Sequence, residues 1–523
     1  MRRIAVSCLI TLLCGISAAG QDFQQYFQRH PALELSNAAT LSFLDAGPLA
    51  RAEVSFQKSN GGLIPLEGSP DAWKADAATE ASRRASARIV FHGKLAYSHR
   101  RGKDMGGPIL MDPESSPIGF LEEDLSSRGT KKRETYSLAC GLAYSLSDKV
   151  SLGAAFDYTS ADQVKFKDPR FQNVLMDLSL RPGALFRLGK TFSMGVNLEY
   201  RLMQEVIGAG LFGSIDRDFQ MLVDQGNFYG ARERLEGDSG YISKTNDRPL
   251  AQSFYGLSLQ AVSHGESQYC GELTALYHTG YFGRRSSTSV VFCEFRGPEI
   301  NYSGTFVHPQ GKDLHRMHIE ASFSLQDNYT NTYKHESELG MTGKVVYLGQ
   351  KKTFSRTRIG ASGSYTFLGD TSGYLPEWEL GADASVLCKL QNTSMYPFGR
   401  DWTSVSIDLD LRAGRNLTRG RNIYSCQVSA SFLTGFGDPR KDTMVPGATT
   451  TLLSFDNYSD RQFEYETATR LGAGIELKYT RMVTGKLIPY VKLADRFVHL
   501  LAAPKHLEGA GRNVACISLG CQF

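Results

Sequence analysis

Apolar and polar side chains alternate along most of this 523-residue chain. One clear example places Tyr136, Leu138, Cys140 and Leu142 at every second position, with small or polar residues between them. Successive side chains of a β-strand point to opposite faces, whereas an amphipathic helix repeats its apolar residues at every third or fourth position. The spacing of two therefore predicts extended strands.

Twenty segments share this alternation between Arg51 and the C-terminus, and short turns alternate with longer loops between them. The segments lie at residues 51–57, 73–80, 88–98, 135–146, 150–158, 174–186, 192–202, 251–264, 267–281, 286–296, 299–308, 314–327, 337–348, 353–368, 376–391, 402–414, 420–434, 463–480, 486–499 and 513–523. We predict an all-β fold, a transmembrane antiparallel up-and-down barrel of about 20 strands, with 16 or 18 as the alternatives if weak segments merge.

Two observations favour a membrane barrel over a soluble β-sandwich. Many segments are about twice as long as the five or six residues of an ordinary strand, which is the length that a tilted strand needs to cross a bilayer. The polar phase also carries charges of both signs, whereas the apolar phase carries almost none. Because Arg or Lys facing lipid costs about 2–4 kcal/mol at the midplane, the polar phase is predicted to line a wet lumen.

The charged residues of this polar phase are the candidate lumen-lining residues. They are Asp177, Arg181, Glu199, Arg201, Arg356, Arg358, Asp408, Asp410, Arg412, Glu464, Glu466 and Arg470.

The two ends of the chain have separate predicted roles. Residues 1–20 combine a basic start, an apolar stretch and small residues, which is typical of a secretory signal peptide. Residues 21–48 precede the first strand, and residues 49–523 form the predicted barrel. The last strand, 513–523, carries its apolar phase up to the terminal Phe523. It resembles the closing strand of Gram-negative outer-membrane barrels, which implies that Phe523 belongs to a signal read by the barrel assembly machinery.

A second, shorter resemblance concerns the segment before the barrel. His30-Pro31-Ala32 is similar to the Asn-Pro-Ala that opens fatty-acid-transporter-like barrels, with His in place of Asn. In those barrels the N-terminal segment plugs the lumen, so the resemblance implies a plug here. A flexible leader to the first strand is the alternative.

Other chemistry is poorly supported by the sequence. The net charge of +4 and the absence of a basic patch argue against nucleic acid as a partner. The seven cysteines after the leader are scattered and odd in number, which favours unpaired thiols over a disulfide framework. Residues 237–240 (Gly-Asp-Ser-Gly) lack the fifth residue of a protease motif, and His315 and His318 point to opposite faces of one strand. We predict no catalytic residues, metal site or cofactor.

The predicted protein is a passive channel or uptake protein for small or hydrophobic solutes, exported to the outer membrane and surrounded there by lipid. A barrel that serves a structural or secretion-accessory role and binds partners through its outer loops is the first alternative, and an enzyme with its site at the barrel rim is the second. The long segment 205–250 mixes apolar and charged residues. It is either a solvated loop or a constriction folded into the lumen.

Overall fold

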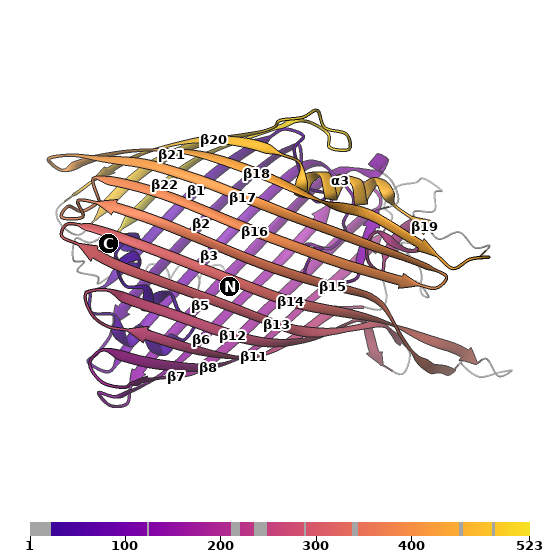
Figure 1. The fold of residues 1–523 in the computed structure, drawn as a ribbon, viewed down its shortest axis with the longest axis horizontal. Helices are drawn as coiled ribbons and strands as arrows, with labels where there is room; N and C mark the ends of the chain where they lie inside the picture. Colours follow the sequence, from indigo (N-terminus) through magenta and orange to yellow (C-terminus); the bar gives the residue numbers. More distant parts are fainter. Residues whose placement is uncertain are drawn as a thin grey trace.

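The computed structural model describes residues 22–122, 125–210, 220–234, 248–286, 289–336, 344–448, 453–483 and 487–523. Eighteen antiparallel strands form one closed barrel (Figure 1). They are β1 (Leu49–Asn60), β2 (Asp71–Arg84), β3 (Ile89–Met105), β5 (Gly129–Ser145), β6 (Val150–Lys165), β7 (Arg170–Arg187), β8 (Phe192–Gly210), β11 (Leu250–Ser263), β12 (Gln268–Ser286), β13 (Ser289–Gln310), β14 (Asp313–Glu336), β15 (Lys344–Gly369), β16 (Trp378–Met395), β17 (Phe398–Arg419), β18 (Asn422–Met444), β20 (Arg470–Arg481), β21 (Ile488–Leu500) and β22 (Gly511–Gln522).

Each barrel strand pairs with its neighbours in chain order, and β22 closes the barrel by pairing with β1. At this closure the backbones of Ala50 and Phe523 exchange two hydrogen bonds, of 2.9 and 3.2 Å. Each of the eighteen described strands therefore has a hydrogen-bonded neighbour on both sides, as a sheet that crosses a bilayer requires. This confirms the predicted fold class.

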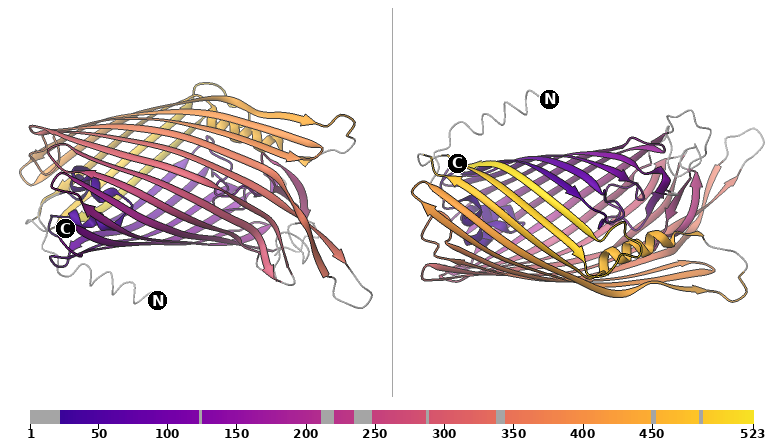
Figure 2. Two further views of the ribbon diagram at one scale, coloured as in Figure 1. Left: turned by 60° about the horizontal axis from the view of Figure 1, so that its bottom comes forward. Right: turned by 90° about the horizontal axis from the view of Figure 1, so that it is seen from above.

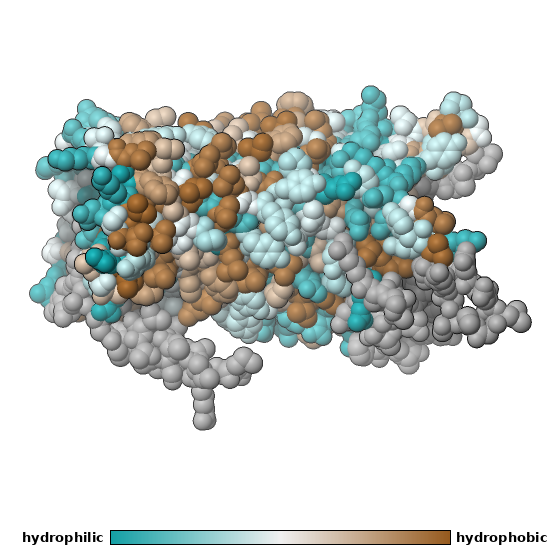
Figure 3. All heavy atoms as spheres, turned by 90° about the horizontal axis from the view of Figure 1, so that it is seen from below, coloured by the Kyte–Doolittle hydropathy of each residue, from teal (hydrophilic) through white to brown (hydrophobic). Residues whose placement is uncertain are grey.

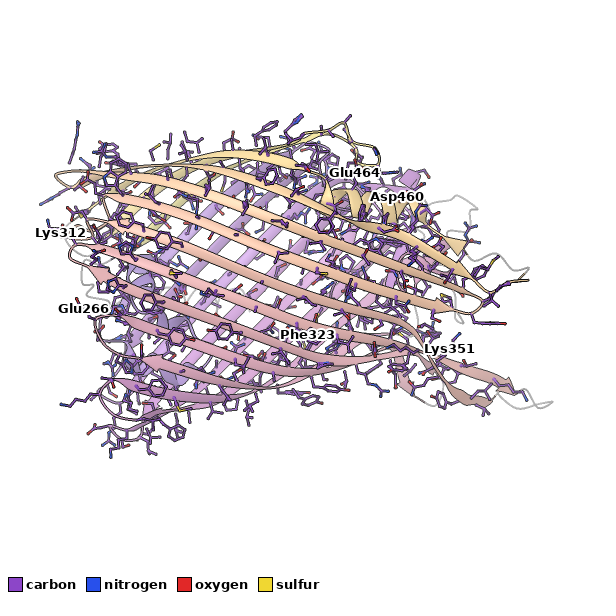
Figure 4. All side chains as sticks on the ribbon, in the orientation of Figure 1. Glu266, Lys312, Phe323, Lys351, Asp460 and Glu464 are labelled. Atoms are coloured by element: carbon purple, nitrogen blue, oxygen red, sulfur yellow. The ribbon has the colours of Figure 1, made fainter. Side chains whose placement is uncertain are left out.

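The two ends of the barrel differ in their connections. Tight connections such as 146–149 and 188–191 gather at the end where the chain enters β1, which we call the turn end. The opposite end, here called the loop end, carries longer segments such as 106–128 and 445–469. Glu266 and Lys312 mark the turn end in Figure 4, and Asp460 and Glu464 mark the loop end.

The strand number is one of the alternatives that the sequence allowed. Segments 286–296 and 299–308 are one strand, β13, because the chain stays extended through Gly297 and Pro298. Segments 337–348 and 353–368 likewise contribute to one strand, β15, within the described residues. Merging these two pairs reduces twenty segments to eighteen strands. The longer loop expected between segments 376–391 and 402–414, residues 392–401, is wrong, because β16 and β17 are joined by Tyr396 and Pro397 alone.

The apolar phase of the strands faces outward. Phe56, Leu142, Leu198, Ile359 and Leu411 are all between 39% and 59% exposed, although they are large hydrophobic side chains. Figure 3 shows apolar side chains spread over the outer wall, with hydrophilic ones more frequent toward the two ends. A soluble protein does not expose so large an apolar surface, whereas a bilayer requires it.

The segment before β1 folds inside the turn end, where the indigo ribbon lies within the barrel in Figures 1 and 2. It consists of α2 (Phe23–Arg29) and two 3-10 turns, η1 (Pro31–Glu34) and η2 (Ala38–Phe43). Asn37 is fully buried, and its Nδ2 donates to the carbonyls of Ala184 (3.0 Å) and Val196 (3.2 Å) on the wall.

Small residues on the inner wall make room for this segment. A Cβ atom at Gly153 would lie 2.0 Å from the backbone nitrogen of Ala39, and one at Gly183 would lie 2.4 Å from Asn37 Oδ1. Both glycines belong to the inward phase of their strands, so η2 lies directly against the backbone of β6 and β7.

Segments also fold inward at the loop end. A four-stranded sheet forms there from β4 (Gly119–Glu122), β9 (Gln220–Asp224), β10 (Tyr229–Arg234) and β19 (Leu453–Ser454). Its β9 residues Met221, Leu222 and Val223 have no exposed surface. The described part of segment 205–250 is therefore packed inside the molecule rather than left as a solvated loop.

One helix stands where the sequence suggested the start of a strand. Residues 456–467 form α3 (Asp456–Thr467), which lies along the loop end, and β20 begins at Arg470 (Figure 2). The predicted strand 463–480 is therefore wrong in its first five residues, where Phe463 and Tyr465 alternate with Glu464 and Glu466 and imitate a strand. None of the helices in the described ranges has the length and apolar character needed to cross a bilayer.

Candidate functional site

A segment between β3 and β5 crosses the lumen at the loop end. We call residues 106–128, of which 123 and 124 lie outside the described ranges, the inner loop. Its backbone is held on one side of the barrel: Asn173 Nδ2 donates to Ile109 O (2.9 Å), and Met111 N donates to Glu205 Oε1 (2.9 Å). Near its C-terminal end, the buried Glu122 carboxylate accepts a hydrogen bond from the buried Lys165.

The tip of the inner loop reaches the opposite wall. Arg358 Nη2 donates to Glu114 Oε2 (2.6 Å), and Lys389 Nζ donates to both carboxylate oxygens (3.0 and 3.2 Å). Arg356 Nη2 donates to the Glu114 backbone oxygen (2.9 Å). Arg356 and Arg358 belong to β15 and Lys389 to β16, and each lies more than 240 residues along the chain from Glu114. We call Arg356, Arg358 and Lys389 the cationic cluster.

The local sequence gives the tip a fixed shape. Pro113 precedes Glu114, and Pro117 follows three residues later, so two backbone φ angles are set near the turn. Asp112 Oδ1 accepts from the Glu114 backbone nitrogen (3.2 Å), and Asp112 O accepts from Ser115 Oγ (2.8 Å). This turn presents the Glu114 side chain outward from the loop.

Helix α3 contributes a second carboxylate to the cluster. Lys389 Nζ donates to Glu466 Oε1 (2.7 Å), and Ser404 Oγ donates to Glu466 Oε2 (3.1 Å). Only 9% of the Lys389 side chain and 12% of the Glu466 side chain are exposed. A salt bridge this deeply buried needs every partner, because removal of one leaves an uncompensated charge.

Two cavities share Glu114 in their lining. One, of about 370 Å³, is lined by Glu114 and the whole cationic cluster together with apolar groups that include Phe228, Phe354 and Trp402. The other, also of about 370 Å³, is lined by Glu114, Arg356, Arg358 and polar residues that include His278 and Glu299. Glu114 therefore borders two spaces large enough for a small organic molecule.

Electrostatics keep the Glu114 carboxylate charged. Burial alone disfavours the ionised form, but the nearby Lys389, Arg358 and Arg356 outweigh burial and lower the pKa of Glu114 to about 2. The opposite holds for Asp224 at the end of β9, which lines the first cavity. There burial outweighs the hydrogen bonds from Gly226 and Phe228 and raises the pKa of Asp224 to about 7.

Of the residues predicted to line the lumen, five meet at this site: Arg356, Arg358, Asp177, Arg201 and Glu466. Arg356 and Arg358 belong to the cationic cluster, and Asp177 and Arg201 line the second cavity, where Arg201 Nη2 donates to Asp177 Oδ2 (2.6 Å). Glu466 contacts the cluster as well, but from helix α3 rather than from a strand.

The remaining predicted residues lie elsewhere. On the strands, Arg181 pairs with Asp157, Glu199 accepts from Ser179 (3.4 Å), Arg412 pairs with Asp383 (2.8 Å), Asp410 pairs with Arg496 (3.3 Å) beside Asp408, and Arg470 donates to Tyr465 O (2.9 Å). Glu464 faces away from the lumen site, and its carboxylate accepts from the backbone nitrogens of Lys505, His506 and Leu507.

Sequence reasoning missed the two residues at the centre of the site. Lys389 occupies the inward phase of a predicted strand, so its position in the polar phase was a usable signal. Glu114 lies in a segment expected to be an outer loop, and no local pattern indicates that it crosses the lumen. The Gly-Asp-Ser-Gly motif at 237–240 lies outside the described residues. Within the described ranges, no group of three or more His, Cys, Asp or Glu side chains is placed to hold a metal ion.

Comparison with known families assigns the chain. The model of a family of unknown function, DUF6850, matches residues 38–523. The chain belongs to this family. The match begins at the start of η2 and covers the whole barrel, so it spans the positions of the inner loop and the cationic cluster in this chain. No curated protein matches the chain.

Solved structures of outer-membrane barrels are similar at low identity. The outer membrane transporter YddB from Escherichia coli is 7% identical, with 90% of this chain and 81% of that chain covered and a TM-score of 0.41. A FadL homologue from Pseudomonas aeruginosa is 12% identical, with 94% of each chain covered and a TM-score of 0.30. BauA, the ferric preacinetobactin receptor from Acinetobacter baumannii, is 8% identical, with 91% and 80% covered and a TM-score of 0.39. Similarities this low carry no argument about the function of this chain.

Proposed function

We propose that this protein is an outer-membrane barrel that passes a small solute through its lumen, and that the inner loop and the N-terminal segment close this path at rest. The observation that carries the proposal is the pair of cavities around Glu114, because both are lined by Glu114 of the inner loop and by Arg356 and Arg358 of the barrel wall. A barrel with a purely structural role has no need of such spaces, since its lumen is more stable when filled.

The N-terminal segment has the features of a plug in this proposal. It carries its own apolar contacts with the wall, including Phe23, Leu41 and Leu44 against Leu49 and Val90. It also contacts the closing strand β22, where Gln522 Oε1 accepts a hydrogen bond from the backbone nitrogen of Phe23 (2.9 Å). This contact and the hydrogen bonds from Asn37 to the wall lie outside the pairing between barrel strands, so the segment can shift without unfolding the barrel.

Export and assembly belong to the same proposal. The signal peptide predicted at residues 1–20 lies outside the described residues. We propose that the strand ending at Phe523 is recognised by the assembly machinery before it pairs with β1, since β22 is the last strand needed to close the barrel.

Ion conductance across a planar lipid bilayer tests the proposed path. We expect purified full-length protein to give small or rare single-channel currents. A variant that lacks residues 24–44 removes α2, η1 and η2, and we expect its single-channel conductance to be at least three-fold larger.

The matched control is Gln24→Ala, because Gln24 is an exposed residue of the same segment and its substitution leaves the wall contacts intact. We expect this control to conduct like the unmodified protein. If neither the full-length protein nor the deletion variant conducts in any applied voltage or salt, the barrel is not a solute path, and a structural or partner-binding role takes its place.

A further inference from the structure

The Glu114 carboxylate is bound by the cationic cluster in the way that the carboxylate of a free small molecule would be bound. Both of its oxygens accept hydrogen bonds from Lys389, and one also accepts from Arg358. Its side chain is 46% exposed, so it borders open space on the cavity sides while its oxygens face the cations. Arg and Lys side chains that converge on one carboxylate form the usual recognition site for an anionic ligand.

The charges at the site do not balance once Glu114 leaves. With Glu114 in place, three cations face two carboxylates, Glu114 and Glu466. Without it, the described partners of the cluster are the Glu466 carboxylate, which accepts from Lys389, and the neutral Gln326, whose Oε1 accepts from Arg356. Two more carboxylates, Asp112 and Glu299, line the second cavity: Asp112 belongs to the inner loop and leaves with it, and Glu299 accepts from Asn301 Nδ2 (2.8 Å). Asp177 is paired with Arg201, and burial raises the pKa of Glu67 and that of Asp224. Displacement of the inner loop therefore leaves an excess of positive charge at the cationic cluster, which favours binding of an anion.

Several buried polar atoms that line the site also lack a hydrogen-bond partner among the described residues. Among the described residues, Arg358 Nε and both ring nitrogens of His278 have no hydrogen-bond partner, although each atom is buried. His278 as a residue is 4% exposed, and it lines the second cavity together with Arg358. Buried polar groups are normally hydrogen-bonded, so these atoms indicate a polar guest in the space between them.

We propose that Arg356, Arg358 and Lys389 bind the carboxylate of a small solute, and that Glu114 is an internal substitute which the solute displaces. This inference rests on the proposed function, because it names the chemical class of the solute that the lumen accepts. Displacement couples binding to opening: when the solute takes the cationic cluster, the tip of the inner loop loses its attachment to the far wall, and the two cavities join.

Binding of succinate to the detergent-solubilised full chain, measured by calorimetry, tests the proposal directly. Glu114→Gln keeps the shape of the side chain but removes its charge, so we expect succinate to bind at least ten-fold more tightly to this variant than to the unmodified protein. In the unmodified protein, Glu114 competes with succinate for the cationic cluster. Because Glu114 is tethered, its effective concentration there is in the millimolar range, and removal of its charge relieves this competition. The uncharged succinamide, tested in parallel, is expected not to bind.

Variants of the cluster give the opposite result. In the Glu114→Gln background, Lys389→Gln is expected to weaken succinate binding at least ten-fold, whereas Lys389→Arg keeps the charge and is expected to retain binding. Arg412→Gln is the matched control, because Arg412 lies on the lumen wall, pairs with Asp383 at 2.8 Å and lines neither cavity. We expect it to leave binding unchanged.

Three outcomes overturn the proposal. They are equal affinity for succinate with Glu114 or Gln at position 114, equal affinity for succinate and succinamide, and inorganic phosphate binding as tightly as succinate, which would make the site a general anion site. The calorimetry needs no current, so it remains informative if the barrel does not conduct. Conversely, a conducting barrel without succinate binding removes this inference and leaves the proposed function standing.

Discussion

At the scale of single residues, the loop end is held together by charges that would be costly if they stood alone. Glu122 and Lys165 are 1% and 0% exposed and share a hydrogen bond, and Arg400 is 1% exposed with carboxylates of Asp442 and Asp456 within 3.0 Å. Each of these groups is stable only because its partner is present. The inner loop and the small sheet are therefore positioned by pairing rather than by apolar packing alone.

Asp224 provides a pH-dependent prediction at this scale. Its ordinary pKa is 3.8, and burial raises the pKa in the folded protein to about 7. Burial of the neutral Asp224 therefore contributes to the free energy of unfolding. This contribution is fully present below pH 3.8 and is lost as the pH rises through 7. Asp224→Asn is neutral at every pH, so we expect it to stabilise the small sheet relative to the unmodified protein only at high pH.

Hydrogen–deuterium exchange of the β9 amides, residues 220–224, measures this effect. At pH 8 we expect at least ten-fold faster exchange in the unmodified protein than in Asp224→Asn, and below pH 4 nearly equal rates. A ratio of rates that does not change between these two pH values would show that Asp224 is not neutral in the folded sheet.

At the scale of elements, the strands are predictable and the segments inside them are not. The alternation at Tyr136 to Leu142 determines which face of β5 contacts lipid. Side chains alternate strictly between the two faces, so assigning one residue to the lipid side assigns all the others. The same rule placed Arg356 and Arg358 in the lumen. It could not place Glu114, because the contact between an inner loop and strands more than 240 residues away exists only after the barrel has closed.

Helix α3 shows a second limit of pattern reasoning. Phe463 and Tyr465 alternate with Glu464 and Glu466, so five residues follow the strand pattern by coincidence. In the helix, Glu464 and Glu466 point in different directions. Glu466 therefore reaches the lumen site, while Glu464 binds the backbone of residues 505–507.

The fit between η2 and the wall gives a prediction at the element scale. Gly153→Val places side-chain atoms where the backbone of Ala38 and Ala39 now lies, so η2 has to move away from β6. We expect trypsin to cut after Arg29 at least ten-fold faster in this variant, since α2 loses its support from the neighbouring turn. The cleavage rate is measured by mass spectrometry of the folded protein in detergent.

Gly363→Ala is the control for this experiment. It adds a Cβ to a barrel strand on the outward phase, and the nearest heavy atom would lie 3.9 Å away. We expect cleavage after Arg29 at the unmodified rate. Equal rates in Gly153→Val and in the unmodified protein would mean that η2 does not depend on the space above Gly153.

At the scale of the whole molecule, segments of the chain fold into the barrel at both ends. The N-terminal segment fills the turn end, and the inner loop, the small sheet and α3 fill the loop end. Between them the inner wall carries small polar residues, such as Ser322, Ser362 and Ser385, which line a space of about 360 Å³. Closure at two levels suits a path that opens only when a solute is present.

The central claim is that one phase of each strand contacts lipid and the other lines an aqueous lumen. Neighbouring residues Val386 and Ser385 on β16 test it, because Val386 is 40% exposed on the outer wall and Ser385 lines the inner one. Single tryptophans are introduced at either position after Trp73, Trp378 and Trp402 are replaced by Phe, and the protein is reconstituted in liposomes. The measurement is fluorescence quenching by brominated lipids and by aqueous iodide. We predict that brominated lipid quenches Val386→Trp and not Ser385→Trp, and that iodide reverses the order; equal quenching of both positions by either agent would contradict the account.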